Sequence, residues 1–209
     1  MKKKLSSYLE AIEHIQNEEV IIHETDTVFG VSGKFDSLKA YALIYKIKKR
    51  SDSKPLGILI SEFSQISMFT NTPLSSLSDI FPLLEKGVTI LVPRKQDLPE
   101  HLILQSDYIA LRIPNHDQAK QILKLTGPLI CTSANLSGSD PISSFEEALP
   151  LLEAGVFFLE GSSEKSKIPS TILKYEAAGY CLIREGNVSK QEIMQNFPFL
   201  LKKTFQFKS

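Results

Sequence analysis

The chain has 209 residues, of which 42% are hydrophobic, and its 24 basic residues balance 24 acidic ones. This length and hydrophobic content suit one folded domain with a substantial core, and they exclude an intrinsically disordered chain. A formal net charge of zero also argues against strong general attraction to nucleic acid or to acidic membranes. Any site for an anion must therefore come from local clustering of cations.

The N-terminal residues and the cysteines indicate the cellular compartment in which we expect the protein. Lysines open the sequence, but polar residues interrupt the hydrophobic residues that follow, so we expect neither a signal peptide nor a membrane span. Cys131 and Cys181 have no metal-binding or redox spacing and fit a reducing cytosol. We expect a cytoplasmic protein of one domain over residues 1–209, with a body at about 5–196 and a short tail at 197–209.

The predicted elements begin with a helix around residues 9–15, behind a Ser6 or Ser7 cap, and a buried strand at 20–22. A second helix is expected at 37–49, with Asp36 as its cap. A third helix is expected at 117–125. A fourth should begin after Ser143 or Ser144, with Pro150 cutting or kinking it, and a last one after Ser189. Further buried strands are expected at residues 57–60, 88–92, 108–113, 129–132, 156–159, 171–175 and 180–184.

Several of these strands follow one another without a helix between them. That order favours a mixed sheet over a purely parallel, doubly wound one. The predicted fold class is therefore α/β with an α+β-like arrangement, in which helices pack on a twisted mixed sheet.

The stretch from residue 23 to 33, HETDTVFGVSG, directly follows a buried strand. Thr25, Asp26 and Thr27 stand where that strand ends, and strand ends are where ligands bind in open α/β sheets. Gly30 and Gly33 allow a close approach of the backbone to a ligand. An ordinary polar turn explains this segment equally well.

A cluster of five cations lies within residues 46–54 of a chain that is neutral overall. For Lys46 and Lys49, the better interpretation is that cations complement the dipole at a helix C-terminus. Lys48 and Arg50 lie two residues apart where the helix ends, and they could converge on one polyanion. The sequence contains neither a Walker A motif nor GxGxxG, so bound ATP would not use the common phosphate loops.

Arg112 lies in a predicted strand, YIALRIPNH, on the same face as Ala110. A fixed guanidinium beside a small side chain leaves room for a carboxylate or a phosphate. An arginine buried alone is costly, so Arg112 needs an anionic partner. A structural salt bridge would also provide that partner and is favoured on this segment alone. His116 is interpreted as a hydrogen-bonding loop residue rather than a general base.

Small polar residues also follow the predicted strand at 129–132, in CTSANLSG. Such a turn can wrap a phosphate or a ribose with hydroxyl and backbone N–H groups, although a plain strand-to-turn junction needs no ligand. Two more segments, PSTIL and LIREG, place Ser170 and Arg184 near strand ends.

Taken in order, the motifs TDTVFG, KxR followed by SKPL, RIPNH, SANLSG, PSTIL and IREG resemble the YrdC/Sua5 family of threonylcarbamoyl-adenylate synthases. The resemblance runs from about Val20 to Gly186. It implies the family's twisted mixed α/β sheet around a deep, positively charged cavity, in the short form without a second domain. It also implies a nucleotidyltransferase that makes threonylcarbamoyl-AMP and pyrophosphate from L-threonine, bicarbonate and ATP.

By this resemblance the product serves N6-threonylcarbamoyladenosine formation in tRNA and passes to the threonylcarbamoyl-transfer machinery. Mg²⁺ would arrive with ATP rather than in a dedicated site of the protein. The catalytic positions implied are Lys48 and Arg50 on the triphosphate and Arg112 on the threonine carboxylate or bicarbonate. The remaining implied positions are Thr25, Cys131 and Ser170 for threonine, and Ser133, Asn135 and Arg184 for ATP.

The sequence departs from the family pattern near the implied threonine pocket. Glu24 and Phe29 replace the usual proline and tyrosine around TDT, Ser51 replaces the proline after KxR, and residues 86–89 stand for the longer PGPxT. The alternatives are a double-stranded RNA-binding or ribosome maturation module, a nucleotide-binding paralogue without synthase activity, and a carbamoyl-transfer relative. For the RNA-binding module, a net charge of zero leaves only weak contact with RNA. A carbamoyl-transfer relative would need attached domains.

Overall fold

The computed structural model describes residues 3–48, 56–103, 106–136, 139–161, 168–176 and 179–200. Within these residues, ten strands form one sheet in the order β1-β8-β2-β3-β7-β4-β6-β5-β9-β10. Neighbours β2–β8, β4–β6 and β5–β9 are parallel, whereas β2–β3, β3–β7, β4–β7, β5–β6 and β9–β10 are antiparallel. The predicted mixed α/β sheet is therefore confirmed.

The strands are β1 (Lys4–Leu5), β2 (Ile21–His23), β3 (Gly30–Lys34), β4 (Gly57–Leu59), β5 (Thr89–Pro93), β6 (Tyr108–Arg112), β7 (Leu129–Ser133), β8 (Phe157–Leu159), β9 (Ile172–Glu176) and β10 (Gly179–Arg184). The α-helices are α1 (Tyr8–Gln16), α2 (Leu38–Lys48), α3 (Phe81–Leu84), α4 (Glu100–Ile103), α5 (Asp117–Thr126), α6 (Phe145–Glu153) and α7 (Lys190–Asn196). Three 3-10 helices are η1 (Phe63–Met68), η2 (Leu74–Ile80) and η3 (Pro198–Leu200).

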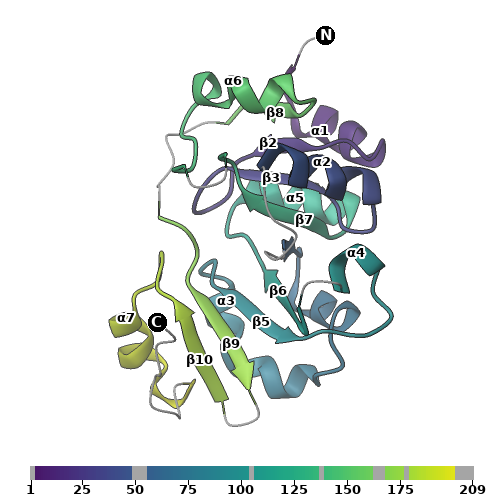
Figure 1. Ribbon diagram of the computed structural model, residues 1–209. Coiled ribbons are helices and arrows are strands. Elements are labelled where there is room, and N and C mark those ends of the chain that lie inside the picture. Colours follow the sequence, from purple (N-terminus) through teal and green to yellow (C-terminus); the bar gives the residue numbers. More distant parts are fainter. Residues whose placement is uncertain are drawn as a thin grey trace.

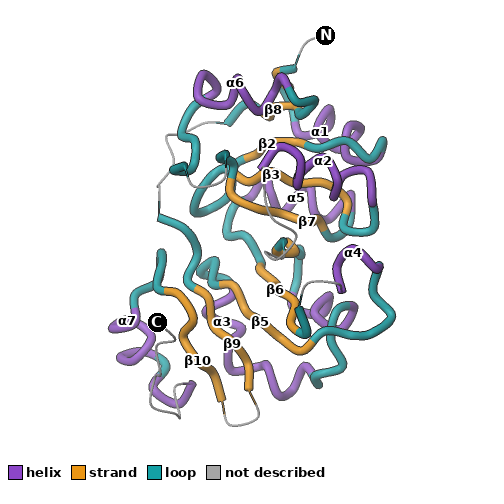
Figure 2. Tube along the Cα trace, viewed as in Figure 1, coloured by secondary structure: helices purple, strands orange, loops and turns teal. Residues whose placement is uncertain are grey.

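The helices gather around two parts of this sheet (Figure 1). Helices α1, α2 and α5 lie beside β2, β3 and β7, while α3 and α7 lie near β5, β9 and β10. The strands follow one another from the first group to the second as a strongly twisted band (Figure 2). None of the helices within the described ranges has the length and hydrophobicity that crossing a membrane requires.

Among the described residues, two hydrophobic clusters form the core. The smaller one packs α1 and α5 on the sheet, where Ile15 and Ile122 meet Ile21 and Leu129. Strand register puts Ile21, Ser32, Cys131, Gly57 and Ala110 in one row across β2, β3, β7, β4 and β6, so they share one face. The helices cover only part of this face, and small residues occupy the rest.

Most predicted elements are confirmed within one or two residues of the expected bounds. Serine hydroxyls accept hydrogen bonds from backbone N–H groups at the starts of α1, α6 and α7, as the capping patterns predict. At α2 the prediction was wrong, because Ser37 rather than Asp36 accepts the hydrogen bond, from the Ala40 N–H at 3.1 Å. Pro150 does not cut α6, which continues to Glu153.

Strand β3 was not predicted, since its first residues belong to the segment at 23–33 that was interpreted as a ligand-binding strand end or an ordinary polar turn. Two glycines make Gly-Val-Ser-Gly-Lys a poor strand sequence, but both lie where neighbours approach closely. A Cβ atom on Gly33 would come within 2.6 Å of the Ala40 Cβ in α2. A Cβ atom on Gly30 would come within 2.8 Å of the Cys131 Sγ. Tertiary packing therefore decides this strand.

Candidate functional site

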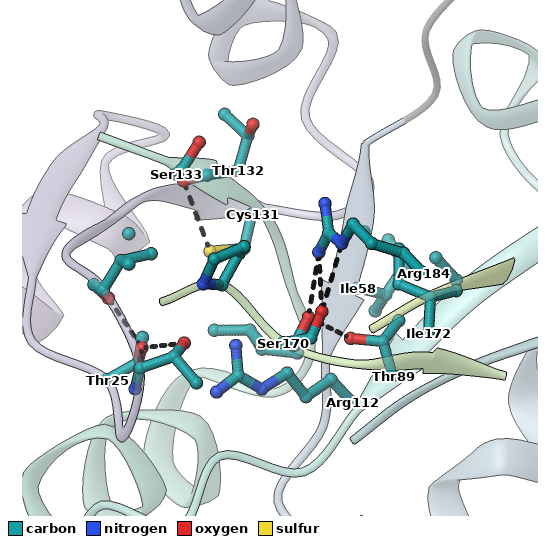
Figure 3. Close-up of a pocket in the computed structure, with 17 residues that line it drawn as sticks. Thr25, Ile58, Thr89, Arg112, Cys131, Thr132, Ser133, Ser170, Ile172 and Arg184 are labelled. Carbon is teal, nitrogen blue, oxygen red and sulfur yellow. Dashed lines mark hydrogen bonds between the residues drawn. The ribbon is translucent and has the colours of Figure 1, made fainter. Parts of the chain in front are cut away.

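A pocket of about 210 Å³ opens on the uncovered part of that sheet face. Its walls come from the turn after β2 and from β3, β4, β5, β6, β7, β9 and β10, segments that are far apart in the sequence. In Figure 3, Thr25 and Cys131 lie on one side of the pocket and Ser170, Thr89 and Arg184 on the other, with Arg112 at its edge.

Small residues in the middle of the sheet create the space. Gly57 pairs with Cys131 on one side and with Ala110 on the other, and all three line the pocket. Arg112 lies two residues beyond Ala110 on the same face, opposite Thr89 of β5. The predicted placement of Arg112 beside Ala110 is therefore confirmed.

Arg112 forms an ion pair with Asp26, whose Oδ1 lies 2.7 Å from the Nη2 of Arg112. The structural salt bridge considered for Arg112 is therefore present. It leaves part of the guanidinium unused, because the buried Nε has no hydrogen-bond partner among the residues that the structure describes. A buried donor without a partner is unfavourable, and an anionic ligand in the pocket would satisfy it.

Arg184 reaches the pocket from β10. Its Nη2 and Nε donate to the carbonyl oxygen of Ser170 at 2.8 and 3.2 Å. The Ser170 hydroxyl in turn lies 2.8 Å from the Thr89 Oγ1. Burial, and then the positive charge of Arg112, lower the pKa of Arg184 below its usual value. The two arginines thus share one pocket, where like charges favour a bound polyanion.

Lys48 lies beside the pocket, at the end of α2, and its side chain is buried. Its Nζ donates to the Ser133 carbonyl oxygen at 2.7 Å and to the Asn135 Oδ1. The Ser133 hydroxyl donates to the same Asn135 oxygen at 2.8 Å. The structure therefore brings three predicted residues together, although only Ser133 lines the pocket. Arg50 lies outside the described residues.

Thr25 lines the pocket and also shapes the turn after β2. Its Oγ1 donates to the Val28 carbonyl oxygen at 2.6 Å and accepts from the Thr27 N–H at 3.2 Å. The Thr27 Oγ1 also lies 3.3 Å from this oxygen, so the Thr25 hydroxyl is used inside the turn and its methyl group remains for a ligand.

Cys131 lines the pocket and is joined to a buried histidine through Ser32. The Ser32 hydroxyl lies 2.8 Å from the His23 Nε2, and the His23 Nδ1 lies 2.9 Å from the Glu24 carbonyl oxygen. A carbonyl only accepts, so Nδ1 carries the hydrogen and Ser32 donates to Nε2. Burial lowers the pKa of His23 to about 4 and raises the pKa of the Cys131 thiol. Both groups are therefore neutral near pH 7.

Of the eight predicted site residues that the structure describes, six line the pocket, namely Thr25, Arg112, Cys131, Ser133, Ser170 and Arg184. Thr27 also lines the pocket, at the strand end where the sequence suggests a ligand, whereas Thr89 and Gly57 were missed as lining residues. Alternation along the strand at 88–92 would have identified Thr89, had the register with Arg112 been known. The hydrogen-bonding role expected for His116 is confirmed, since its Nδ1 accepts from the Ala119 N–H and its Nε2 lies 3.3 Å from the Glu24 Oε2.

Comparisons with known proteins agree on one family. The model of the Sua5/YciO/YrdC domain, described as "Telomere recombination", matches residues 13–186. A protein of Wigglesworthia glossinidia brevipalpis named threonylcarbamoyl-AMP synthase is 31% identical over 187 residues, which are 88% of this chain and 95% of that protein. A putative threonylcarbamoyl-AMP synthase of Methanocaldococcus jannaschii is 30% identical, over 92% of this chain and 90% of that protein.

Solved structures show the same fold. P. abyssi Sua5 complexed with L-threonine superposes with a TM-score of 0.80 at 20% identity, over 93% of this chain and 60% of that one. E. coli YciO superposes with a TM-score of 0.79 at 20% identity, over 89% of this chain and 96% of that one. This chain thus spans about three fifths of the Sua5 chain but nearly all of YciO. With the family model matching residues 13–186, the chain belongs to the Sua5/YciO/YrdC family.

Proposed function

We propose that this chain is an L-threonylcarbamoyladenylate synthase that acts in the cytoplasm for tRNA modification. Relatives about 30% identical over most of the chain carry the name threonylcarbamoyl-AMP synthase. The pocket supports the same proposal through one observation. Arg112 presents a buried Nε without a partner among the described residues, in a cavity that Thr25 and Ser170 also line.

The reaction proceeds in two steps that need no nucleophile from the protein. The threonine amine adds to the carbon of bicarbonate, and loss of water leaves a carbamate. A carbamate oxygen then attacks the α-phosphorus of ATP, the bond to the β-phosphate oxygen breaks, and pyrophosphate leaves. The protein has to bring three reactants together and to neutralise negative charge.

The residues at the pocket suit these tasks. Arg112 binds the carboxylate of threonine through Nε, next to Thr25 and Cys131. Arg184 and Ser133 face the nucleotide, and Ser170 lies between the two substrates. Lys48 and Arg50 hold the triphosphate, which ATP brings as its Mg²⁺ complex. Asn135 fixes the ammonium group of Lys48 through the hydrogen bond already described.

Substrate omission tests this proposal. We expect pyrophosphate release from ATP only when both L-threonine and bicarbonate are present. Serine should be a poorer substrate, because a fitted apolar contact with the threonine methyl group is worth about 1–3 kcal/mol. Release that proceeds without threonine, or equally well with serine, would refute the assigned substrate. Appearance of threonylcarbamoyl-AMP by mass spectrometry distinguishes synthesis from simple ATP hydrolysis.

A further inference from the structure

The ion pair between Asp26 and Arg112 is largely shielded from water. Each side chain is 11% exposed, and Oδ1 lies 2.7 Å from Nη2. The two residues are 86 positions apart, one in the turn after β2 and the other at the end of β6. A charge-assisted hydrogen bond of this kind fixes the orientation of a planar guanidinium more firmly than packing alone.

The pair determines which donors of Arg112 remain for a ligand. Asp26 engages Nη2, whereas Nε stays buried without a partner among the described residues. Arg112 lines the pocket and Asp26 does not. Asp26 therefore holds the guanidinium from outside the cavity and leaves Nε for a ligand.

Gly87 leaves the space that this arrangement needs. It lies between α3 and β5 with φ +76°, a conformation that side-chain-bearing residues rarely adopt. A Cβ atom on Gly87 would lie 1.8 Å from the Asp26 Oδ2 and 3.1 Å from the Arg112 Nη2. Any side chain at this position would therefore displace the carboxylate from the guanidinium.

We propose that Asp26 and Gly87 are positioning residues for Arg112, which turn its Nε toward the carboxylate of L-threonine. Asp26 anchors the guanidinium through Nη2, and Gly87 leaves the room that this anchor needs. This inference rests on the proposed function, since threonine supplies the anion. The opposing model is competition, in which Asp26 occupies Arg112 in the empty enzyme and the threonine carboxylate must displace it.

The two models predict opposite changes in the affinity for threonine when Asp26 is replaced by Asn. Positioning predicts that the KM for threonine rises about tenfold or more, the loss that one charge-assisted hydrogen bond carries. The KM for ATP should stay within about twofold, since Asp26 acts on the threonine end alone. Gly87→Ala should likewise raise the KM for threonine and leave the KM for ATP nearly unchanged. Asp26→Glu should raise the KM for threonine less than Asp26→Asn does. Direct titration of the protein with L-threonine should show the same shifts in Kd.

The matched control is Asp107→Asn. It breaks another aspartate–arginine pair, in which Asp107 is 92% exposed and lies 3.7 Å from Arg94, so both KM values should stay unchanged. Tighter threonine binding by Asp26→Asn, or equal rises in both KM values, would overturn the proposal. If the parent enzyme needs threonine and Asp26→Asn binds it normally, this inference alone fails. If the parent enzyme releases pyrophosphate without threonine, the proposed function itself fails.

Discussion

Arg184 pairs with Ile172 across β9 and β10, although Leu182 pairs with Leu173, so Ile183 is an extra residue on β10. Without this bulge, Arg184 would share the face of Leu182, which belongs to the core. With it, Arg184 and Ile172 both line the pocket. Bulges often redirect a side chain at a functional site in this way.

Deleting Ile183 should remove the bulge but leave Arg184 directly after Leu182 and opposite Ile172, so Arg184 should stay on the pocket face. We expect the KM for ATP of this variant to stay within about threefold of the parent, whereas Arg184→Ala should raise it about tenfold or more, the effect of one lost charge-assisted contact. Ile183→Ala keeps the bulge and removes a side chain that is 52% exposed, so it should behave like the parent. Steady-state kinetics on the three variants check this, and a deletion variant that behaves like Arg184→Ala would contradict the observed register.

Lys48 tests the triphosphate assignment. Lys48→Ala should lower catalytic efficiency about ten- to a hundredfold if the ammonium group contacts ATP. The sequence alone suggests that this variant keeps its melting temperature, but the structure corrects that expectation. Lys48 is only 4% exposed and bonded to Ser133 and Asn135, so Lys48→Ala should also lower Tm.

Lys49→Ala serves as the control for Lys48, because Lys49 matches no position of the family's KxR. We expect it to lose less than about threefold in efficiency, the range of a minor surface charge. Arg50→Ala should resemble Lys48→Ala in kinetics. Equal losses at residues 48, 49 and 50 would indicate a diffuse electrostatic effect and contradict the assignment.

Stability should fall in mild acid because of His23. Its pKa is lowered from 6.5 to about 4 in the folded protein, so the unfolded chain binds a proton that the folded chain does not. Stability from this group is complete above pH 6.5 and is lost as the pH falls toward about 4, by up to about 1.4 kcal/mol per pH unit. Urea unfolding at several pH values should show that the free energy of unfolding of His23→Gln depends less steeply on pH than that of the parent. The same pH dependence in both proteins would contradict the assignment of His23 as a neutral, buried histidine.

The sequence predicted the parts of the fold that have a local signal. Apolar runs mark β2 and β4, and serines mark the starts of α1, α6 and α7. Strand β3 has no such signal, because Gly30 and Gly33 are chosen by their neighbours in space. Short helices such as α3 and α4 contain too few turns for a hydrophobic period.

The same limit applies to the site. Ordered motifs placed Thr25, Arg112 and Ser170 at one pocket: Thr25 follows a predicted strand, Arg112 lies at the end of one, and Ser170 directly precedes one. The pairing of Arg112 with Asp26 depends on tertiary contact between distant segments. Strict alternation along β10 would put Arg184 on the wrong face, and only the observed register reveals the bulge.

Gly30 and Cys131 allow a test of how closely the pocket floor is packed. A Cβ atom on Gly30 would lie 2.8 Å from the Cys131 Sγ and 3.5 Å from the Thr25 Cγ2. Gly30→Ala should therefore lower Tm and raise the KM for threonine, because overpacking a tight site costs about 1–3 kcal/mol. Removing the sulfur removes the clash. Adding Cys131→Ala to the Gly30→Ala variant should therefore restore much of the lost Tm and much of the threonine KM.

Thermal unfolding and threonine kinetics on the parent, both single variants and the double variant form a complete cycle. Contacting residues couple by about 0.5–3 kcal/mol, and here the double variant should be more stable than the two single losses predict. Cys131→Ala alone should keep synthase activity, because the proposed reaction uses no protein nucleophile and burial raises the pKa of this thiol. Strictly additive losses would show that Gly30 is needed for a reason other than the Cys131 side chain. Complete inactivity of Cys131→Ala would instead assign chemistry to the thiol and contradict the proposed mechanism.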